Sequence, residues 1–167
     1  MSKLEISIYD KNEVATYKPL KTWTKKPILI RIMDDENWTR YPKLQYEKCY
    51  KAIHKVSFLD VEVEPDDKKR QDIYKDELLT DDKIQGVLDF LNQFEPSKIS
   101  EVVIHCSSGR RRSVALGAFI AKYLIEDNAL YYRISHIYSD DENVDDVGNP
   151  VIYKQLVKYY DCLLYTS

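Results

Sequence analysis

Hydrophobic and polar residues alternate along this chain with two different periods, one typical of strands and the other typical of helices. Short runs rich in apolar and β-branched residues predict strands at Leu4–Tyr9, Pro27–Met33, Val56–Val63 and Glu101–Cys106. Apolar residues at helical spacing predict helices at Tyr41–Val56, at Asp81–Phe94 behind a Thr80 N-cap, at Arg111–Ile125, and around Ile152–Leu163. The polar segment Glu64–Asp76 has no apolar period and predicts a loop.

This alternation of strands with helices predicts an α/β fold, with a mostly parallel central sheet covered by helices on both faces. At 167 residues the chain is long enough for one domain with a sizeable core and short for two, so we expect a single domain over residues 1–167. Hydrophobic residues make up 44% of the chain and charged residues 32%, a mixture that is typical of a globular protein and not of a disordered one.

The chain is weakly acidic, with a net charge of −3 and a pI near 5.7, so as a whole it is no electrostatic match for nucleic acid or an anionic membrane. No run approaches the roughly 20 apolar residues that span a bilayer, and the start lacks the apolar core of a secretory signal. The odd number of cysteines, Cys49, Cys106 and Cys162, suits a reducing compartment. We therefore expect an intracellular, cytoplasmic protein without stable membrane association.

The most unusual segment is VVIHCSSGRRRSVALGAF, in which a glycine separates a cysteine from three consecutive arginines. A strand ending at Cys106 and a helix beginning near Arg111 leave a tight loop, Ser107 to Arg110, at the edge of the sheet where ligands bind in such folds. The backbone N–H groups of this turn and the positive end of the helix dipole make an anion cradle. Gly109 supplies the torsional freedom that lets successive amides point inward. The segment predicts a binding site for a dianion such as phosphate.

Four side chains add chemistry to this cradle. A helix N-terminus and nearby cations lower the pKa of a thiol from about 8.5, so Cys106 is a candidate nucleophile in its thiolate form. Arg112 would grip two phosphoryl oxygens with its planar guanidinium, in the ground state and more strongly in the transition state. Ser113 would hydrogen-bond the sulfur and ease its departure, and His105 would orient the loop through backbone carbonyls.

The nine residues HCSSGRRRS match the His-Cys-x-x-Gly-x-x-Arg-Ser/Thr signature, so the chain resembles the cysteine-dependent protein tyrosine and dual-specificity phosphatases. The resemblance extends from about Ile28 to Leu163 and looks closest to small bacterial and phage members of the dual-specificity type. Outside the loop, VSFLDVE resembles the strand and aspartate of the general-acid loop, and GNPVIYKQL resembles a C-terminal helix start in that group.

The resemblance implies a two-step hydrolysis of phosphomonoesters that needs no metal and no other cofactor. Cys106 would attack phosphorus to form a cysteinyl-phosphate, which water would then hydrolyse. The phosphate would be bound by the loop residues Ser107, Ser108, Gly109, Arg110, Arg111 and Arg112. A carboxylic acid must protonate the leaving oxygen. Asp60 is the candidate for this role, and Asp66 and Asp67 on the following polar segment remain alternatives.

The substrate stays open at this point. Phosphotyrosine in a phosphorylated protein or peptide is the leading expectation, with phosphoserine and phosphothreonine added if the pocket is shallow. Phosphoinositide and RNA 5′ phosphatases also use this signature, and Arg110 and Arg111 resemble the basic residues of phosphoinositide phosphatases. The hypothesis from another class is a phosphate-binding module without turnover, which would have the cradle but no competent acid. The sequence does not specify the oligomeric state.

Overall fold

The computed structural model describes residues 4–19, 22, 24–35, 37, 40–61 and 78–166 of the chain. Among these residues, four strands form one sheet with the order β1-β4-β2-β3, and all three pairings are parallel. The strands are β1 (Glu5–Tyr9), β2 (Lys26–Met33), β3 (Ala52–Ser57) and β4 (Ile99–His105). The predicted α/β class with a parallel central sheet is confirmed.

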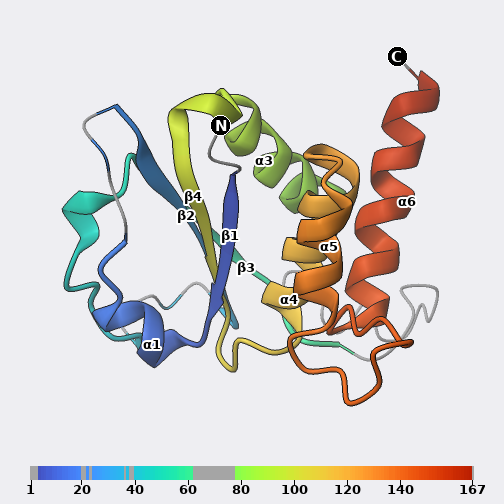
Figure 1. Cartoon of the computed structure of the whole chain (residues 1–167), viewed down its shortest axis with the longest axis horizontal. Coiled ribbons are helices and arrows are strands. Elements are labelled where there is room, and N and C mark those ends of the chain that lie inside the picture. Colours follow the sequence, from blue (N-terminus) through green and yellow to red (C-terminus); the bar gives the residue numbers. More distant parts are fainter. Residues whose placement is uncertain are drawn as a thin grey trace.

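Helices cover the two faces of this sheet unequally (Figure 1). One face carries α3 (Asp81–Asn92), α4 (Arg112–Phe119), α5 (Asn128–Ser135) and α6 (Pro150–Thr166). The other carries α1 (Lys11–Thr16) and a 3-10 helix, Glu47–Cys49. Helix α4 is central, because it packs against β1 and β4 on one side and against α5 and α6 on the other. No helix in the described part of the chain is long and apolar enough to cross a membrane.

The face under α3 to α6 buries almost only apolar side chains, and we refer to it as the apolar face. Ile28, Ile30 and Ile32, alternate residues of β2, enter a core that they share with Phe119 of α4 and Ile152 of α6. All five side chains are at most 2% exposed. Burial of one such side chain contributes about 1.5–3 kcal/mol, so this face carries most of the hydrophobic stabilisation.

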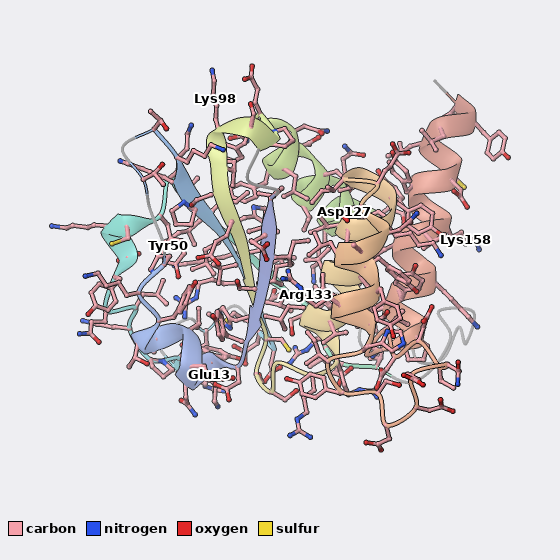
Figure 2. All side chains as sticks on the ribbon, viewed as in Figure 1. Glu13, Tyr50, Lys98, Asp127, Arg133 and Lys158 are labelled. Atoms are coloured by element: carbon pink, nitrogen blue, oxygen red, sulfur yellow. The ribbon has the colours of Figure 1, made fainter. Side chains whose placement is uncertain are left out.

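The opposite face buries fewer apolar groups beside several polar ones, and we refer to it as the polar face. Leu29 and Val103 pack there with Tyr50, next to the buried side chains of Arg31 and His105. Figure 2 shows Tyr50 on this side of the sheet, together with Glu13 of α1, and shows Arg133 and Lys158 on the helical side. Neighbouring residues of one strand thus enter two different environments, as the period of two requires.

The helix predicted at Tyr41–Val56 is wrong. The segment contains the 3-10 helix, and β3 begins at Ala52. β3 lies at the edge of the sheet and pairs with β2, and this backbone pairing decides the conformation of residues whose own pattern is ambiguous. The strand predicted at Val56–Val63 is also wrong beyond Ser57, because the described residues Phe58–Val61 form no strand. The predicted loop Glu64–Asp76 lies outside the described residues.

The other predicted elements are confirmed with small changes of bounds. Thr80 caps α3, since its hydroxyl accepts a hydrogen bond from the Lys83 N–H at 3.4 Å. The predicted helix Arg111–Ile125 forms α4 and continues as a π-helical turn at Ile120–Leu124. Helices α1 and α5 have no counterpart in the sequence prediction, although each follows an aspartate N-cap, Asp10 and Asp127.

The carboxyl ends of all four strands meet at one edge of the sheet because the strands are parallel. The residues beyond these ends are Asp10 after β1, Asp34 after β2, the segment Phe58–Val61 after β3, and Cys106 after β4. β4 lies between β1 and β2, so Cys106 has the ends of two other strands beside it. The fold therefore gathers a thiol and several carboxylates at the edge where parallel sheets bind ligands.

Candidate active site

The loop between β4 and α4 lies at the lower edge of the sheet in Figure 1, and Cys106 is its first residue. Gly109 in this loop has a φ of 69°. A Cβ at this position would lie 2.7 Å from the Asp10 nitrogen and 2.8 Å from the Tyr9 carbonyl carbon. The torsion and the space both require glycine, which lets the loop lie directly against the end of β1.

Cys106 is 1% exposed, and its sulfur has hydrogen-bond partners from the loop and from the first turn of α4. The Gly109 N–H donates to Sγ at 3.2 Å, and the Ser113 hydroxyl lies 3.1 Å from Sγ. Burial raises the pKa of the Cys106 thiol, but the hydrogen bonds from Ser113, the charge of Arg112 and the Gly109 N–H lower it by more, so the net pKa lies below its usual value. The site favours the thiolate, which is the nucleophilic form.

Arg112 is anchored by acceptors that follow two different strands. Its side chain is 6% exposed, and Nη1 lies 2.7 Å from Asp34 Oδ1. The same nitrogen donates to the Phe58 carbonyl oxygen at 2.7 Å. A buried guanidinium needs such partners to offset its loss of water. The guanidinium is therefore held at the start of α4 by the segments that follow β2 and β3.

Asp34 is a site residue that sequence reasoning missed. Besides its ion pair with Arg112, its two carboxylate oxygens each lie 3.3 Å from the Ser107 hydroxyl, which donates to them. Burial raises the pKa of Asp34, but the charge of Arg112 and the hydrogen bonds from Arg112, Tyr41 and Ser107 bring it below its usual value. The available signal was its position directly after the predicted strand Pro27–Met33, but only the strand order shows that this strand lies beside β4.

Asp60 lies at the rim of the loop, in the segment that follows β3. Its Oδ2 accepts a hydrogen bond from Arg111 Nε at 2.8 Å, and its Oδ1 accepts one from Asn149 Nδ2 at 2.5 Å. The structure thus brings Asp60 next to the arginine that precedes Arg112. Asn149, just before α6, is a second residue that sequence reasoning missed. The alternative acids Asp66 and Asp67 lie outside the described residues.

Arg110 and Ser108 are on the exposed side of the loop. The Arg110 guanidinium lies over the ring of Tyr138, 5.1 Å from its centroid, and the Tyr138 hydroxyl donates to the Gly109 carbonyl at 3.2 Å. Ser108 accepts a hydrogen bond from the Arg110 N–H at 3.4 Å. Tyr138 therefore stabilises the outer part of the loop. The expected contact of Arg110, Arg111 and Ser108 with phosphate stays a prediction.

His105 lies behind the loop on the polar face and is fully buried. Arg31 Nε donates to its Nε2 at 2.9 Å, so the ring proton is on Nδ1, which lies 3.5 Å from the Cys106 carbonyl oxygen. Burial, and then the charge of Arg31, lower the pKa of His105 to about 3. His105 is therefore neutral at physiological pH, with a fixed tautomer directed at the backbone of Cys106.

Among the described residues, no group of three or more His, Cys, Asp or Glu side chains is placed to hold a metal ion. Cys49, Cys106 and Cys162 are all free thiols, and Cys162 is exposed on α6.

Comparison with known proteins yields remote similarities only. No protein-family model matches the sequence, and no curated protein matches it significantly. Among solved structures, human DUSP28 is similar with a TM-score of 0.47 and 14% identity over 97% of this chain and 95% of that chain. The human tyrosine phosphatase-like serine/threonine/tyrosine-interacting protein is similar with a TM-score of 0.40 and 16% identity over 84% of this chain and 80% of its own. The expected closeness to small bacterial and phage members of the dual-specificity type stays a prediction.

Proposed function

We propose that the protein is a metal-independent phosphomonoester hydrolase that acts on phosphotyrosine in proteins or peptides, and on phosphoserine and phosphothreonine if the pocket is shallow enough. The observation that carries this proposal is the environment of the Cys106 sulfur, buried beside the start of α4 with Gly109 N–H at 3.2 Å and the Ser113 hydroxyl at 3.1 Å. Arg112 begins the same helix. These groups favour a thiolate, and the N-terminus of α4 beside it would favour a bound anion.

In the proposed first step, the Cys106 sulfur attacks phosphorus, an S–P bond forms, and the bond between phosphorus and the ester oxygen breaks. Asp60 gives a proton to that oxygen, which leaves as a phenol or an alcohol. In the second step, water attacks phosphorus while Asp60 takes its proton, and the electron pair of the S–P bond returns to sulfur. Ser113 stabilises the returning thiolate through its hydrogen bond.

Arg112 would neutralise charge on the phosphoryl group. Its Nη1 is already engaged by Phe58 and Asp34, so Nε and Nη2 are the pair that would grip two phosphoryl oxygens. In this scheme Asp34 orients the guanidinium and does not contact the substrate. The role requires the planar fork of arginine, since the ammonium of lysine is a point charge.

The surroundings of the loop favour a phosphorylated protein over a phosphoinositide or an RNA 5′ end. Arg111 pairs with Asp60, and Arg110 stacks on Tyr138, so both guanidinium groups already have partners within the protein. A groove of about 430 Å³ beside Tyr138 is lined by four carboxylates, those of Asp140, Asp141, Asp145 and Asp146. Carboxylates at this place would repel a polyanionic substrate. A cytoplasmic location belongs to the proposal, because a catalytic thiolate must stay reduced.

The test is hydrolysis of p-nitrophenyl phosphate in the presence of EDTA. We expect Cys106→Ser to abolish turnover while it still binds phosphate, and Arg112→Lys to lower kcat by about 10²- to 10³-fold. Cys162→Ser is the matched control, because Cys162 is exposed on α6, and its activity should equal that of wild type. Equal turnover by Cys106→Ser and wild type would refute covalent catalysis, and binding without any turnover by wild type would favour a phosphate-binding module.

A further inference from the structure

The residues before α6 press against the loop of the candidate site. Gly148 has a φ of 71°. A Cβ at this position would lie 2.4 Å from the Arg111 carbonyl oxygen and 3.0 Å from that of Arg110. The backbone N–H of Asn149 donates to the same Arg111 oxygen at 3.1 Å. The start of α6 is therefore fixed to the rim of the loop through backbone contacts that only glycine permits at position 148.

Asn149 is fully buried, and both polar atoms of its side chain are engaged. Its Oδ1 accepts hydrogen bonds from the N–H groups of Val151 and Ile152, at 3.0 and 3.1 Å, and so caps α6. Its Nδ2 donates to Asp60 Oδ1 at 2.5 Å and to the Val61 carbonyl at 2.8 Å. Rotation of the amide by 180° would set donors against donors, so the helix cap fixes the direction in which Nδ2 points.

The two oxygens of Asp60 therefore have partners of different kinds. Oδ1 is held by a neutral amide that is fully buried, and Oδ2 by the Arg111 guanidinium, whose side chain is 36% exposed. An amide N–H can hold a carboxyl group in either protonation state, because a protonated carboxyl keeps one oxygen that only accepts. A guanidinium carries donors alone, so a protonated Oδ2 could not donate to it and would have to direct its O–H at another acceptor.

We propose that Asn149 is the positioning residue for the general acid, and that Oδ2 of Asp60 is the oxygen that delivers the proton. This inference rests on the proposed hydrolase function. Asn149 holds Oδ1 and the Val61 carbonyl throughout, and Arg111 holds Oδ2 in the free protein and leaves it for the proton transfer. Once Arg111 has left, Oδ2 takes up a proton from water. In the transfer the Oδ2–H bond breaks and the proton goes to the ester oxygen as the P–O bond cleaves. The Asp60 carboxylate then accepts the proton of the water that attacks in the second step, and Arg111 pairs with Oδ2 again after that proton has passed to solvent.

Asn149→Asp separates the two uses of the side chain. Aspartate keeps the acceptor that caps α6, because Asp and Asn are similar N-caps, and in its carboxylate form it offers no donor to Asp60 or Val61. The measurement compares phenyl phosphate, a poor leaving group, with p-nitrophenyl phosphate, an activated one of similar size. We expect kcat/KM for phenyl phosphate to fall about 10²-fold and that for p-nitrophenyl phosphate to fall less than about threefold, because general-acid catalysis contributes roughly 10²- to 10⁴-fold where the leaving group needs a proton.

Three further variants make the comparison quantitative. Asn143→Asp introduces the same chemical change at an exposed position in the segment that leads to α6, and it should leave both rates at the wild-type value. Asp60→Asn sets the size of the effect when the acid is absent. Arg111→Gln should keep or raise the ratio of the phenyl to the p-nitrophenyl rate, and a fall of that ratio to the Asp60→Asn level would overturn the assignment of Oδ2.

The failures of this inference and of the proposed function have different signatures. Equal losses on the two esters in Asn149→Asp, at an unchanged Tm, would refute the positioning role and leave the hydrolase intact. Should Asn149→Asp not fold, Asn149→Ser keeps an N-cap hydroxyl and is read in the same way. Absence of Cys106-dependent turnover in wild type would remove the proposed function, and the inference with it.

Discussion

The two faces of the sheet bury different chemistry, and each face supports a different part of the candidate site. On the apolar face, Phe119 and its neighbours fix α4, whose first turn carries Arg112 and Ser113. On the polar face, hydrogen bonds between buried side chains fix β4, whose last residue is His105. The loop around Cys106 joins the two elements. The geometry of this loop therefore depends on non-directional apolar packing on one face and on directional hydrogen bonds on the other.

The largest expected effect is a loss of stability caused by a substitution on the apolar face. Phe119 is 1% exposed, stacks with Tyr123 and lies edge-to-face with Tyr160, so Phe119→Ala leaves a cavity under α4. We expect the free energy of unfolding to fall by about 3–5 kcal/mol, measured by urea denaturation. Tyr165→Ala is the control, because Tyr165 is 91% exposed on α6 and should change stability by less than about 0.5 kcal/mol. A loss below about 1 kcal/mol for Phe119→Ala would mean that the apolar face is less tightly packed.

The next largest effect is a loss of stability caused by the removal of one buried hydrogen bond on the polar face. The Tyr17 hydroxyl donates to Glu101 Oε1 at 2.7 Å, and the Ser7 hydroxyl donates to Oε2 at 2.6 Å, at a carboxyl group that is 5% exposed. Tyr17→Phe removes one donor and leaves a buried acceptor unpaired, at a cost of about 1.5–3 kcal/mol. Tyr165→Phe is the matched control in the same denaturation experiment. An unchanged midpoint for Tyr17→Phe would show that Glu101 finds another partner.

A pH titration sharpens the comparison, because the apolar face has little to titrate. The pKa of His105 is about 3 in the folded protein and 6.5 as its usual value, so the unfolded chain binds the proton first as pH falls. The stability that this residue contributes is complete above pH 6.5 and is lost on acidification, by about 1.4 kcal/mol per pH unit, down to about pH 3. Wild type should therefore lose about 2 kcal/mol more than His105→Gln between pH 6.5 and pH 5. Parallel curves for the two proteins would contradict the buried, neutral His105.

The smallest expected effect lies where the two faces meet. Ser113→Ala removes the hydroxyl that lies 3.1 Å from the Cys106 sulfur, so the pKa of the thiol should rise. The measurement is the pH dependence of iodoacetamide alkylation in a background in which Cys49 and Cys162 are serine. Ser135→Ala, at a buried serine of α5, should leave the midpoint in place. A midpoint that stays or falls in Ser113→Ala would mean that Ser113 does not stabilise the thiolate.

The contrast also explains which parts of the fold were predictable from the sequence. Pro27–Met33 and the α3 residues bury their own apolar side chains, so their local pattern predicts their conformation. β3 has a mixed pattern and owes its conformation to pairing with β2, which no local window contains. Helix α1 has a capping box formed by Asp10 and Glu13, a usable signal at a helix too short to show a hydrophobic period.

The candidate site divides in the same way. The segment His105 to Ser113 carries its chemistry within consecutive residues, so it could be located by motif. Asp34 and Asn149 reach the loop only because β2 lies beside β4 and because α6 docks on the loop's rim, and neither relation follows from the spacing of residues. Asp60 could be proposed from the resemblance of VSFLDVE to a general-acid loop, but its pairing with Arg111 depends on the folded loop.

Gly109 lies so close to Tyr9 and Asp10 that the connection between β1 and α1 packs directly against the loop around Cys106. An insertion of one or two residues into that connection would push its backbone into the loop around Cys106. An insertion of equal length at the exposed residues 95–98, before β4, lies at the opposite end of the sheet from this loop. Tolerance to insertions should therefore be lowest at the connection between β1 and α1, although this connection contributes no reacting group in the proposed mechanism. A library of short insertions, scored by activity, would show which connections contact the loop around Cys106.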